Sequence, residues 1–394
     1  MDSEIATPEQ IAEQLAEHTA EDKMAKDSKP TKSNKLEIAV ETTKHPKSLP
    51  ANESYGFGKF FSDHMFITEY SEVLGWHAPR IQPYQSLRLD PGAAVLHYGQ
   101  AIFEGMKAFR GDDGKIRLFR PEANHRRMVA SADRLCMKMV DFDIFVESLV
   151  RLVQTDINWV PTKPGTALYL RPTLIGSEAF LGVRPAEAFI YYVIASPVGG
   201  YYGDNIETVK IWIERKYSRA APGGIGMTKA GGNYAASLIA ATEAKKRGFA
   251  QVLWLDSSEK RFVEEVGTMN VFFRIGDEVI TPPLGGTILP GVTRDCVIQL
   301  MKARGTPVIE RPIGLDEVID AHIRGDLKEV FGSGTAASIS PVGALGHGDE
   351  LITINGGKVG QISAELYKTL NDIQYGRIPD EFGWTMEIPL GAQK

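Results

Sequence analysis

The chain has 394 residues, of which 43% are hydrophobic and 24% are charged, and its formal net charge is −6. This length predicts two domains with enough apolar surface for their cores, and the acidic balance with scattered Lys and Arg predicts no nucleic-acid partner. Cys136 and Cys296 stand far apart without a CxxC motif, and the eight histidines form no ligand-spaced group. No apolar run nears the ~20 residues that cross a bilayer. We therefore expect no disulfide framework, no metal site and no membrane span.

Residues 1–50 differ in composition from the rest of the chain. They contain no Phe, Tyr or Trp and mix Glu, Lys, Ser and Pro, so they offer too little apolar surface to offset the entropy lost on ordering. We predict a disordered or weakly ordered tail. The segment also lacks arginine and has no apolar core, which argues against a transit peptide and a secretory signal and predicts a cytoplasmic location.

The pattern of residues 51–198 predicts a smaller N-terminal domain of mixed α and β structure. A turn of glycines and aspartates at 111–114 joins two of its strands into a hairpin. Helical spacing of apolar residues covers 121–136 and 141–159. The expected strands are 65–70, 106–110, 115–119, 167–174 and 188–195.

Residues 199–205 are rich in glycine and turn formers, and we expect them to be the loop between domains. A C-terminal cofactor-binding domain, 206–394, follows. Its expected strands are 209–213, 251–255, 261–266 and 270–275, and its expected helices are 235–247 and 293–304. Because the chain contains no GxGxxG motif and no P-loop, any phosphate must be held in another way.

Lys229 lies within the run 217–234, among glycines and small residues and just before a predicted helix. A solvated surface lysine does not need such a setting. An amine nucleophile does, because an aldehyde cofactor requires close backbone approach and an environment that lowers the lysine pKa from about 10.4.

Several motifs in one order resemble the branched-chain amino-acid aminotransferases, which are pyridoxal-phosphate enzymes of fold type IV. The resemblance extends from about Tyr55 to the C-terminus and implies an α+β fold of two domains. The motifs are Phe57-Gly58-Lys59, Asp63-His64-Met65, Leu96-His97-Tyr98, Phe103-Glu104-Gly105-Met106-Lys107-Ala108, Leu118-Phe119-Arg120-Pro121, Tyr169-Leu170-Arg171-Pro172, the Lys229 run, Glu265-Val266-Gly267-Thr268-Met269-Asn270, Leu289-Pro290-Gly291-Val292-Thr293-Arg294 and Gly332-Ser333-Gly334-Thr335-Ala336.

The resemblance implies pyridoxal 5'-phosphate as the cofactor. It also implies a residue of this chain as the partner of each functional group of the cofactor. Lys229 would attach to the aldehyde and, once released by the substrate, carry the proton. Glu265, rather than adjacent Glu264, would face the pyridine nitrogen, which compensates a carboxylate in an apolar strand. Tyr234 would hydrogen-bond the phenolic oxygen, although a purely structural role stays open for a buried tyrosine.

The phosphate is expected at the start of the helix that follows Pro290, where free amides and the helix dipole favour an anion. Arg127 matches the family's phosphate arginine, although its neighbour Arg126 is an alternative. The expected cofactor-binding set is completed by residues of the same motifs: Thr268, Val292, Thr293 and Thr335, the last from a second turn that glycines permit.

The substrate pocket of this family is largely apolar and has to accept both a branched side chain and glutamate. Arg171 follows Tyr169 by two positions, on one face of one strand, and a carboxylate is expected there with help from Tyr98. A structural ion pair for Arg171 remains the alternative. Amides near Thr335 and Ala336 would bind the α-carboxylate. The remaining expected wall residues are Phe57, Phe103, Tyr201 and Met269.

Leu181 and Val183 resemble a loop that reaches into the neighbouring protomer's site, so the family likeness implies a homodimer. Mammalian members have a CxxC motif just after the phosphate threonine, where this chain has Ala337-Ser338-Ile339-Ser340. A redox switch built on that thiol pair is therefore excluded here.

The expected reaction is transamination of L-leucine, L-isoleucine and L-valine with 2-oxoglutarate, giving branched-chain 2-oxo acids and L-glutamate. A D-amino-acid transaminase or an aminodeoxychorismate lyase of the same fold is the first alternative, since it would share Lys229 and Glu265. The aromatic pocket argues against both, and a lyase would release pyruvate without any keto acceptor. A non-catalytic amino-acid or phosphate-binding protein is the second alternative, but it has no use for a buried reactive amine.

Overall fold

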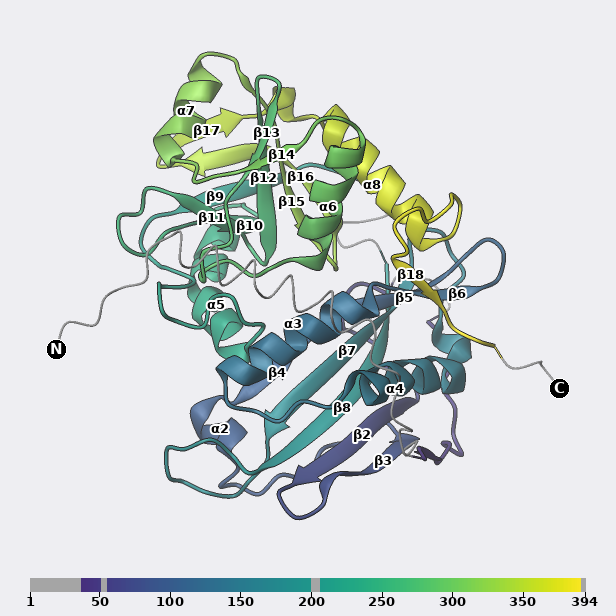
Figure 1. The fold of residues 1–394 in the computed structure, drawn as a ribbon. Helices are drawn as coiled ribbons and strands as arrows, with labels where there is room; N and C mark the ends of the chain where they lie inside the picture. The colour runs from purple at the N-terminus through teal and green to yellow at the C-terminus, as the bar shows by residue number, and fades with distance from the viewer. Residues whose placement is uncertain (1–36, 51–54, 200–205, 391–394) are drawn as a thin grey trace, which may run out of the picture. The chain divides into compact units, whose positions relative to one another are not determined.

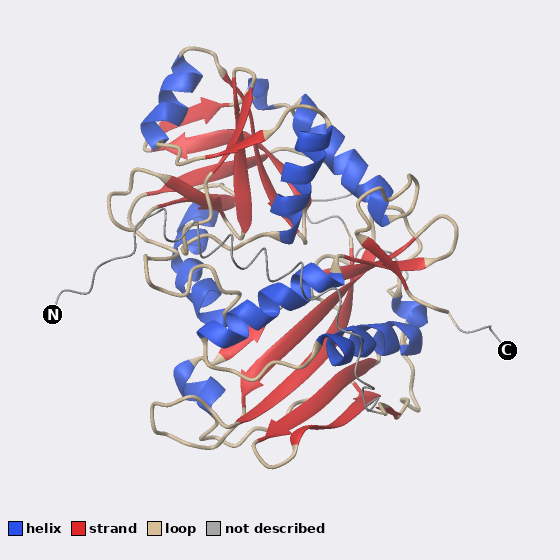
Figure 2. Cartoon of the chain, viewed as in Figure 1, coloured by secondary structure: helices blue, strands red, loops and turns tan. Residues whose placement is uncertain are grey.

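The structure is a computed structural model that describes residues 37–50, 55–199 and 206–390. The larger part of the predicted tail, residues 1–36, lies outside these ranges, as do Tyr201 and nearly all of the predicted interdomain loop. By their contacts, the described residues from Ile38 onward group as one unit. Figure 2 shows two groups of strands, each accompanied by helices.

The first sheet has nine strands among the described residues, in the order β1-β3-β2-β8-β7-β5-β6-β18, with β4 paired to β7. All its pairings are antiparallel except that of β1 with β3. The predicted hairpin around 111–114 is confirmed, since β5 pairs with β6. The strands are β1 Ala39–Val40, β2 His64–Ser71, β3 Gly75–Pro83, β4 Ala101–Phe103, β5 Met106–Arg110, β6 Ile116–Phe119, β7 Ala167–Gly176, β8 Ala188–Val198 and β18 Thr385–Glu387.

Two helices, α3 Pro121–Arg134 and α4 Phe142–Thr155, pack on this sheet (Figure 1). Phe145, Leu149 and Leu152 recur at helical spacing on α4 and are fully buried, because this stripe faces the strands. A short helix, α2 Ala94–Tyr98, precedes β4.

The second predicted helix was expected to reach residue 159, but α4 ends at Thr155 and a 3₁₀ turn, Ile157–Trp159, follows. The reason is Asp156, whose carboxylate accepts hydrogen bonds from the backbone N–H of His64 at 2.9 Å and from its ring Nδ1 at 2.6 Å. These two bonds hold Asp156 against β2, so the helix does not continue through it.

Residues 37–50, which composition assigns to the tail, have a defined conformation in the structure. Ala39–Val40 pair with Arg80 and Ile81 of β3, and the N–H of Thr43 donates to His64 Nε2 at 2.8 Å. Backbone hydrogen bonds to an existing sheet edge do not depend on aromatic content, so the composition of this segment does not reveal them.

The second sheet also has nine strands within the described ranges, in the order β11-β10-β9-β16-β15-β12-β13-β14, with β17 paired to β16. The four strands and two helices expected in this half are all present, but α5 begins one turn earlier than predicted. The elements are β9 Val209–Glu214, α5 Gly231–Lys246, β10 Gln251–Leu255, β11 Val263–Val266, β12 Met269–Ile275, β13 Glu278–Thr281, α6 Val292–Ala303, β14 Val308–Glu310, α7 Leu315–Ile323, β15 Leu327–Gly334, β16 Ser338–His347, β17 Glu350–Thr353, the 3₁₀ turn Asn355–Gly357 and α8 Gln361–Gln374.

The two sheets are joined by packing as well as by the chain. One buried cluster combines Phe109 and Tyr169 of the first sheet with Phe272 and Phe331 of the second. The segment before α5 is attached to β4, since Ile102 forms a β-bridge with Ala230. Among the helices of the described residues, none combines the length and the apolar character that a bilayer crossing requires.

Candidate active site

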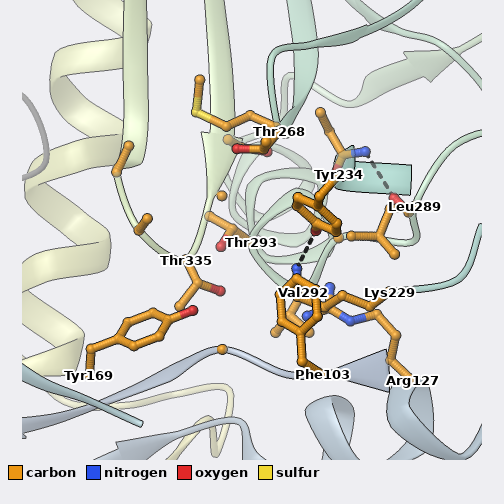
Figure 3. A pocket seen from close by; sticks show the side chains of 18 of the residues that line it. Phe103, Arg127, Tyr169, Lys229, Tyr234, Thr268, Leu289, Val292, Thr293 and Thr335 are labelled. Carbon is orange, nitrogen blue, oxygen red and sulfur yellow. Dashed lines mark hydrogen bonds between the residues drawn. The ribbon is translucent and has the colours of Figure 1, made fainter. Parts of the chain in front are cut away.

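A pocket of about 410 Å³ lies where the two sheets meet. Thirteen residues expected at the site line it: Phe57, Phe103, Arg127, Tyr169, Arg171, Lys229, Tyr234, Thr268, Met269, Val292, Thr293, Thr335 and Ala336. Figure 3 shows ten of the lining residues labelled, with the hydrogen bond between Lys229 and Tyr234 dashed near the middle. Side chains more than 250 positions apart in sequence thus share one cavity.

Both backbone polar groups of Lys229, its N–H and its carbonyl, are hydrogen-bonded. Its N–H donates to Ser131 Oγ at 3.1 Å, and its carbonyl accepts from the N–H of Phe103 at 3.0 Å. The preceding turn needs Gly226, because a Cβ there would lie 2.5 Å from both Ala220 Cβ and Thr287 O. The glycine-rich run therefore gives the close backbone approach that the sequence predicts.

The Lys229 amine donates to Tyr234 Oη at 2.9 Å. Burial, followed by the positive charge of Arg127, lowers the pKa of Lys229 to about 8. Burial also raises the pKa of Tyr234 to about 12, so this hydroxyl stays protonated and able to donate. The pair places an unusually easily deprotonated amine beside a neutral phenol.

Glu265 is the penultimate residue of β11 and is buried, and its two oxygens differ in their partners. Oε1 accepts from the N–H of Leu289 at 2.8 Å. Oε2 lies 3.2 Å from Arg219 Nε, but that N–H is not aligned for a hydrogen bond. Burial raises the pKa of Glu265, with Arg219 opposing the shift. Oε2 is therefore the oxygen left for a further donor.

Glu264, the alternative to Glu265, does not reach the same place. Successive side chains of a strand point to opposite faces, and the small cavity that Glu265 shares with Tyr234 and Thr268 is not lined by Glu264. Leu289 completes that cavity.

At the other end of the pocket, α6 begins at Val292 after Gly291, as expected. The first turn of a helix leaves its N–H groups without helical acceptors, so this end favours an anion. Asn270 holds the approach to the helix: its Nδ2 donates to the carbonyl of Leu289 at 2.9 Å, and a Cβ on Gly291 would lie 2.0 Å from its Oδ1. Leu289 is thereby fixed through both of its peptide groups.

Arg127 reaches this end of the pocket from α3, whereas its neighbour Arg126 is exposed and does not line the pocket. Glu104 binds Arg127 bidentately, with Oε1 2.7 Å from Nε and Oε2 2.8 Å from Nη2. Nη1 donates to the carbonyl of Pro290 at 3.2 Å. A guanidinium has five N–H donors, so two remain for an anion after these three bonds. Arg127 holds the pKa of Glu104 below its usual range despite burial.

The glycines near Thr335 were expected to permit a turn, but the structure gives them another role. Gly332 and Gly334 belong to β15, and neither has a positive φ. A Cβ on Gly332 would lie 2.8 Å from Met269 Cε and 2.9 Å from Val266 Cγ1. These glycines therefore make room for the side chains of Met269 and Val266. The turn itself is formed by residues 335–337.

The substrate end of the pocket combines aromatic rings with one cation. The Arg171 guanidinium lies 4.6 Å from the ring centre of Phe103 and 5.2 Å from that of Tyr169, and its Nη2 donates to Tyr169 Oη at 3.0 Å. Phe57 packs edge-on against Tyr169. No ion pair of Arg171 exists among the described residues, and its buried Nε has no hydrogen-bond partner there. The structural ion pair considered for Arg171 is thus not seen.

Three predicted substrate residues lie away from the pocket of their own chain. Tyr98 is on α2, and its hydroxyl donates to the carbonyl of Leu181 in the loop after β7. Leu181 is 65% exposed and Val183 is 88% exposed. Within one chain, Tyr98 therefore does not assist Arg171.

Glu104, Arg219 and Asn270 also belong to the site, although no role was expected for them from their motifs and runs in the sequence. Glu104 carries the signal that singled out Glu265, namely a carboxylate in an apolar segment that needs a partner. Arg219 and Asn270 contact Glu265 and Leu289, and only the fold brings them there.

The arrangement fits pyridoxal phosphate. Lys229 supplies the amine, Oε2 of Glu265 has room for a donor at the pyridine nitrogen, and Tyr234 offers a hydroxyl. The start of α6 and the two free N–H groups of Arg127 suit a phosphate, and the rings near Arg171 form a wall. Pockets of this size bind ligands of this class.

A family model described as amino-transferase class IV matches residues 101–345. The branched-chain-amino-acid transaminase 1 of Bacillus subtilis is 48% identical over 90% of this chain and 100% of its own length. The chain belongs to the class IV aminotransferases.

Two solved structures have the same fold. The branched-chain amino acid aminotransferase of Escherichia coli matches with a TM-score of 0.70 and 25% identity, over 82% of this chain and 99% of that one. A second branched-chain amino acid aminotransferase, from T.th., was solved with pyridoxamine 5'-phosphate and matches with a TM-score of 0.69 and 25% identity, over 82% and 98%. The predicted family, enzyme class and α+β fold of type IV are confirmed.

Proposed function

We propose that the protein transfers the amino group of L-leucine, L-isoleucine or L-valine to 2-oxoglutarate, giving the branched-chain 2-oxo acids and L-glutamate. The observation that carries the proposal is the Lys229 amine, hydrogen-bonded to Tyr234 in a pocket with a carboxylate at one end and an anion site at the other. The names of the Bacillus relative and of the two solved structures support the choice of amino acids.

The cofactor is pyridoxal 5'-phosphate, whose ring supplies the electron sink that lets the amino acid lose its α-proton. The protein's part is to hold it by three separated points: Lys229 at the aldehyde, Glu265 at the pyridine nitrogen, and the α6 end with Arg127 at the phosphate. These groups come from the segment before α5, from β11, and from α6 together with α3, so they would allow the ring one orientation in the pocket.

Lys229 also moves the proton. Its lowered pKa leaves about a tenth of the amine neutral at pH 7, compared with well under a thousandth for a free lysine. A neutral Nζ released from the cofactor takes the proton from the amino acid's α-carbon. The hydroxyl of Tyr234, 2.9 Å away, keeps Nζ oriented toward the pocket.

The side-chain subsite accepts two kinds of substrate. Phe57, Phe103 and Met269 offer apolar contact for a branched side chain. Arg171, which lacks a carboxylate partner among the described residues, offers its guanidinium to the side-chain carboxylate of glutamate or 2-oxoglutarate. A site with both features matches the two half-reactions.

We also propose that the protein acts as a homodimer in the cytoplasm. Leu96, Tyr98, Phe180, Leu181 and Val183 form an exposed apolar patch on α2 and the loop after β7. Apolar patches of this kind on the surface of one chain mark interaction sites. A second copy that covered the patch would bring the three residues that lie away from their own pocket to the other chain's pocket. Sedimentation of Val183→Glu, compared with the parent protein, tests this point.

The transaminase proposal is tested by absorption spectroscopy of the purified holoenzyme. Adding L-leucine should convert the band of the bound aldehyde cofactor to that of its amine form, and adding 2-oxoglutarate should restore it. Conversion by D-alanine but not by L-leucine would favour the D-amino-acid transaminase, and pyruvate release from aminodeoxychorismate without an oxo acid would favour the lyase. The absence of any cofactor band would favour the non-catalytic binding protein.

A further inference from the structure

Lys107 links the first sheet to the turn that follows β15. It lies in β5 directly opposite Tyr169 of β7, so both side chains project from the same face of the sheet. The Lys107 ammonium donates to the carbonyl of Ala336 at 2.8 Å. This contact joins residues 229 positions apart in sequence.

The turn of residues 335–337 separates Lys107 from the pocket. Thr335, Ala336 and Ala337 line the pocket, but Lys107 does not. Lys107 instead lines a cavity of about 20 Å³, together with Thr335 and Ser338. The ammonium therefore holds the turn from behind.

Holding the Ala336 carbonyl also fixes the next amide. In a trans peptide the C=O and the following N–H point in opposite directions. With the carbonyl of Ala336 directed to Lys107, the N–H of Ala337 is directed away from it, toward the pocket. Among the described residues this N–H has no recorded acceptor. It is a free donor at the pocket wall.

The peptide between Ala336 and Ala337 needs an anchor, because the common β-turn types differ by a rotation of roughly 180° of the central peptide. The strands on either side are fixed, since Gly334 pairs with Ser338 across the ladder. Ser338 has a φ of 58°, a left-handed conformation that is unfavourable for a side chain other than glycine. Nothing in the ladder itself sets which way the peptide between Ala336 and Ala337 faces.

The placement of the ammonium also has an electrostatic effect. Burial lowers the pKa of Lys107 to about 8, so this position is unfavourable for a cation that has only a neutral carbonyl as partner. A positive charge behind the turn becomes favourable once an anion binds in front of it, because the low-dielectric surroundings strengthen the attraction between the two.

We propose that Lys107 is a positioning residue, which orients the peptide between Ala336 and Ala337 so that the amide of Ala337 binds the α-carboxylate of the amino acid or 2-oxo acid. The inference rests on the proposed function for the identity of the ligand. It differs from the role of Arg171, because every substrate carries an α-carboxylate and only some carry a second one.

The test compares Lys107→Met with Lys107→Arg, which keeps a donor, and with Lys115→Met as a matched control. Lys115 is half-exposed and pairs with Glu387 at the surface. Calorimetry on each holoenzyme measures the Kd of 4-methylvalerate, a leucine analogue that keeps the carboxylate but lacks the amine. Half-reaction kinetics give KM and kcat for L-leucine and for 2-oxoglutarate.

Lys107→Met should raise the Kd of 4-methylvalerate about ten- to a hundredfold, and the KM of both substrates by a similar factor, with a smaller change in kcat. Lys107→Arg should recover most of the loss, and Lys115→Met should match the parent. The Kd of pyridoxamine 5'-phosphate for the apo-protein should change less than that of 4-methylvalerate.

Unchanged binding of 4-methylvalerate by Lys107→Met would overturn the inference, as would a loss confined to 2-oxoglutarate. If Lys107→Met does not fold, Lys107→Gln, which keeps a shorter donor, is held to the same expectations. A parent enzyme that does not convert L-leucine would instead count against the proposed function, and the Lys107 variants would then be compared on 4-methylvalerate and 2-oxoglutarate binding alone.

Discussion

The two ends of the pocket each contain a buried carboxylate beside an arginine, yet the two pairs behave differently. At the phosphate end, Glu104 is bound bidentately by Arg127 and its pKa is lowered. At the ring end, Arg219 lies beside Glu265 without an aligned hydrogen bond from its Nε, and the pKa of Glu265 is raised. The same residue types are therefore arranged in two ways: Glu104 has both of its oxygens hydrogen-bonded to its arginine, whereas Oε2 of Glu265 has no aligned hydrogen bond from the Nε of its arginine.

A third arginine extends the comparison. Arg171 has no carboxylate partner among the described residues and is held by Tyr169 and the faces of two rings. A cation left in this state favours an anion that comes with the substrate. Under the proposed function, the acid that completes each arginine comes from a different source: a fixed side chain for Arg127, a side chain shared with the cofactor for Arg219, and the substrate for Arg171.

The largest effect is expected at Lys229, whose positive charge acts to lower the pKa of both carboxylates. Lys229→Ala should lower turnover by about 10⁴-fold or more, because the covalent anchor and the proton carrier are both lost. The phosphate end should still hold the cofactor, as equilibrium dialysis would show. In the parent protein, borohydride should trap the cofactor on Lys229, and a reduced adduct on another lysine would contradict the assignment.

The ring end is tested by Glu265→Gln. An amide cannot hold the pyridine nitrogen protonated as a carboxylate does, so the chemical step should slow by about a hundredfold for every amino acid. Single-turnover rates with L-leucine, L-valine and L-glutamate measure this. Glu264→Gln is the matched control and should have a much smaller effect. A loss selective for one substrate would place Glu265 in the substrate subsite instead.

The third arginine is tested by Arg171→Leu. The side-chain carboxylate of 2-oxoglutarate would then be desolvated without a partner, at a cost of roughly 2–5 kcal/mol, whereas leucine has no charge there. In single-turnover kinetics, kcat/KM for 2-oxoglutarate should fall by about one to three powers of ten more than kcat/KM for L-leucine. Equal losses in both half-reactions would assign Arg171 to the α-carboxylate or to the strand.

The phosphate end is tested by Glu104→Gln, which leaves Arg127 buried without its counter-charge. Removing one partner of a buried ion pair costs about 3–5 kcal/mol of stability, so the apo-protein should unfold at markedly lower urea concentration. Pyridoxal phosphate should recover part of the loss, since its phosphate supplies negative charge to the same arginine. Glu265→Gln, where the ion pair is less well aligned, should destabilise the apo-protein less. The reverse order would remove the distinction between the two pairs.

These differences show which parts of the site a sequence can reveal. Lys229, Glu265 and the start of α6 have local signals: a glycine-rich run before a helix, a carboxylate ending an apolar strand, and a Pro-Gly pair before a helix. The bidentate pairing of Glu104 with Arg127 and the attachment of Asn270 to Leu289 have none, because each depends on partners that only the fold brings together.

The fold also divides into features with a local signal and features that depend on distant partners. Alternating and helical patterns predicted nine strands, β2 and β5 to β12, and the helices α3 to α6, including the hairpin between β5 and β6, but they did not predict β15 and β16 in the middle of the second sheet. They missed what depends on a distant partner: the strand at Ala39–Val40, the break at Asp156 and the return of Thr385–Glu387 to β6. Tyr98 was placed with Arg171 by its motif, but its own chain holds it at Leu181.

The smallest effect expected is a pH dependence of cofactor capture. Burial, and then Arg127, lower the pKa of Lys229 to about 8. Since only the neutral amine attacks an aldehyde, the rate of covalent capture of pyridoxal phosphate by the apo-protein should rise about tenfold per pH unit below pH 8 and level off above it. Stopped-flow absorbance over pH 6.5–9.5 measures the profile, with Nα-acetyl-lysine as the reference, whose rate should keep rising to about pH 10.4. A profile of the apo-protein that follows the free lysine would show that the pocket does not lower the pKa of Lys229.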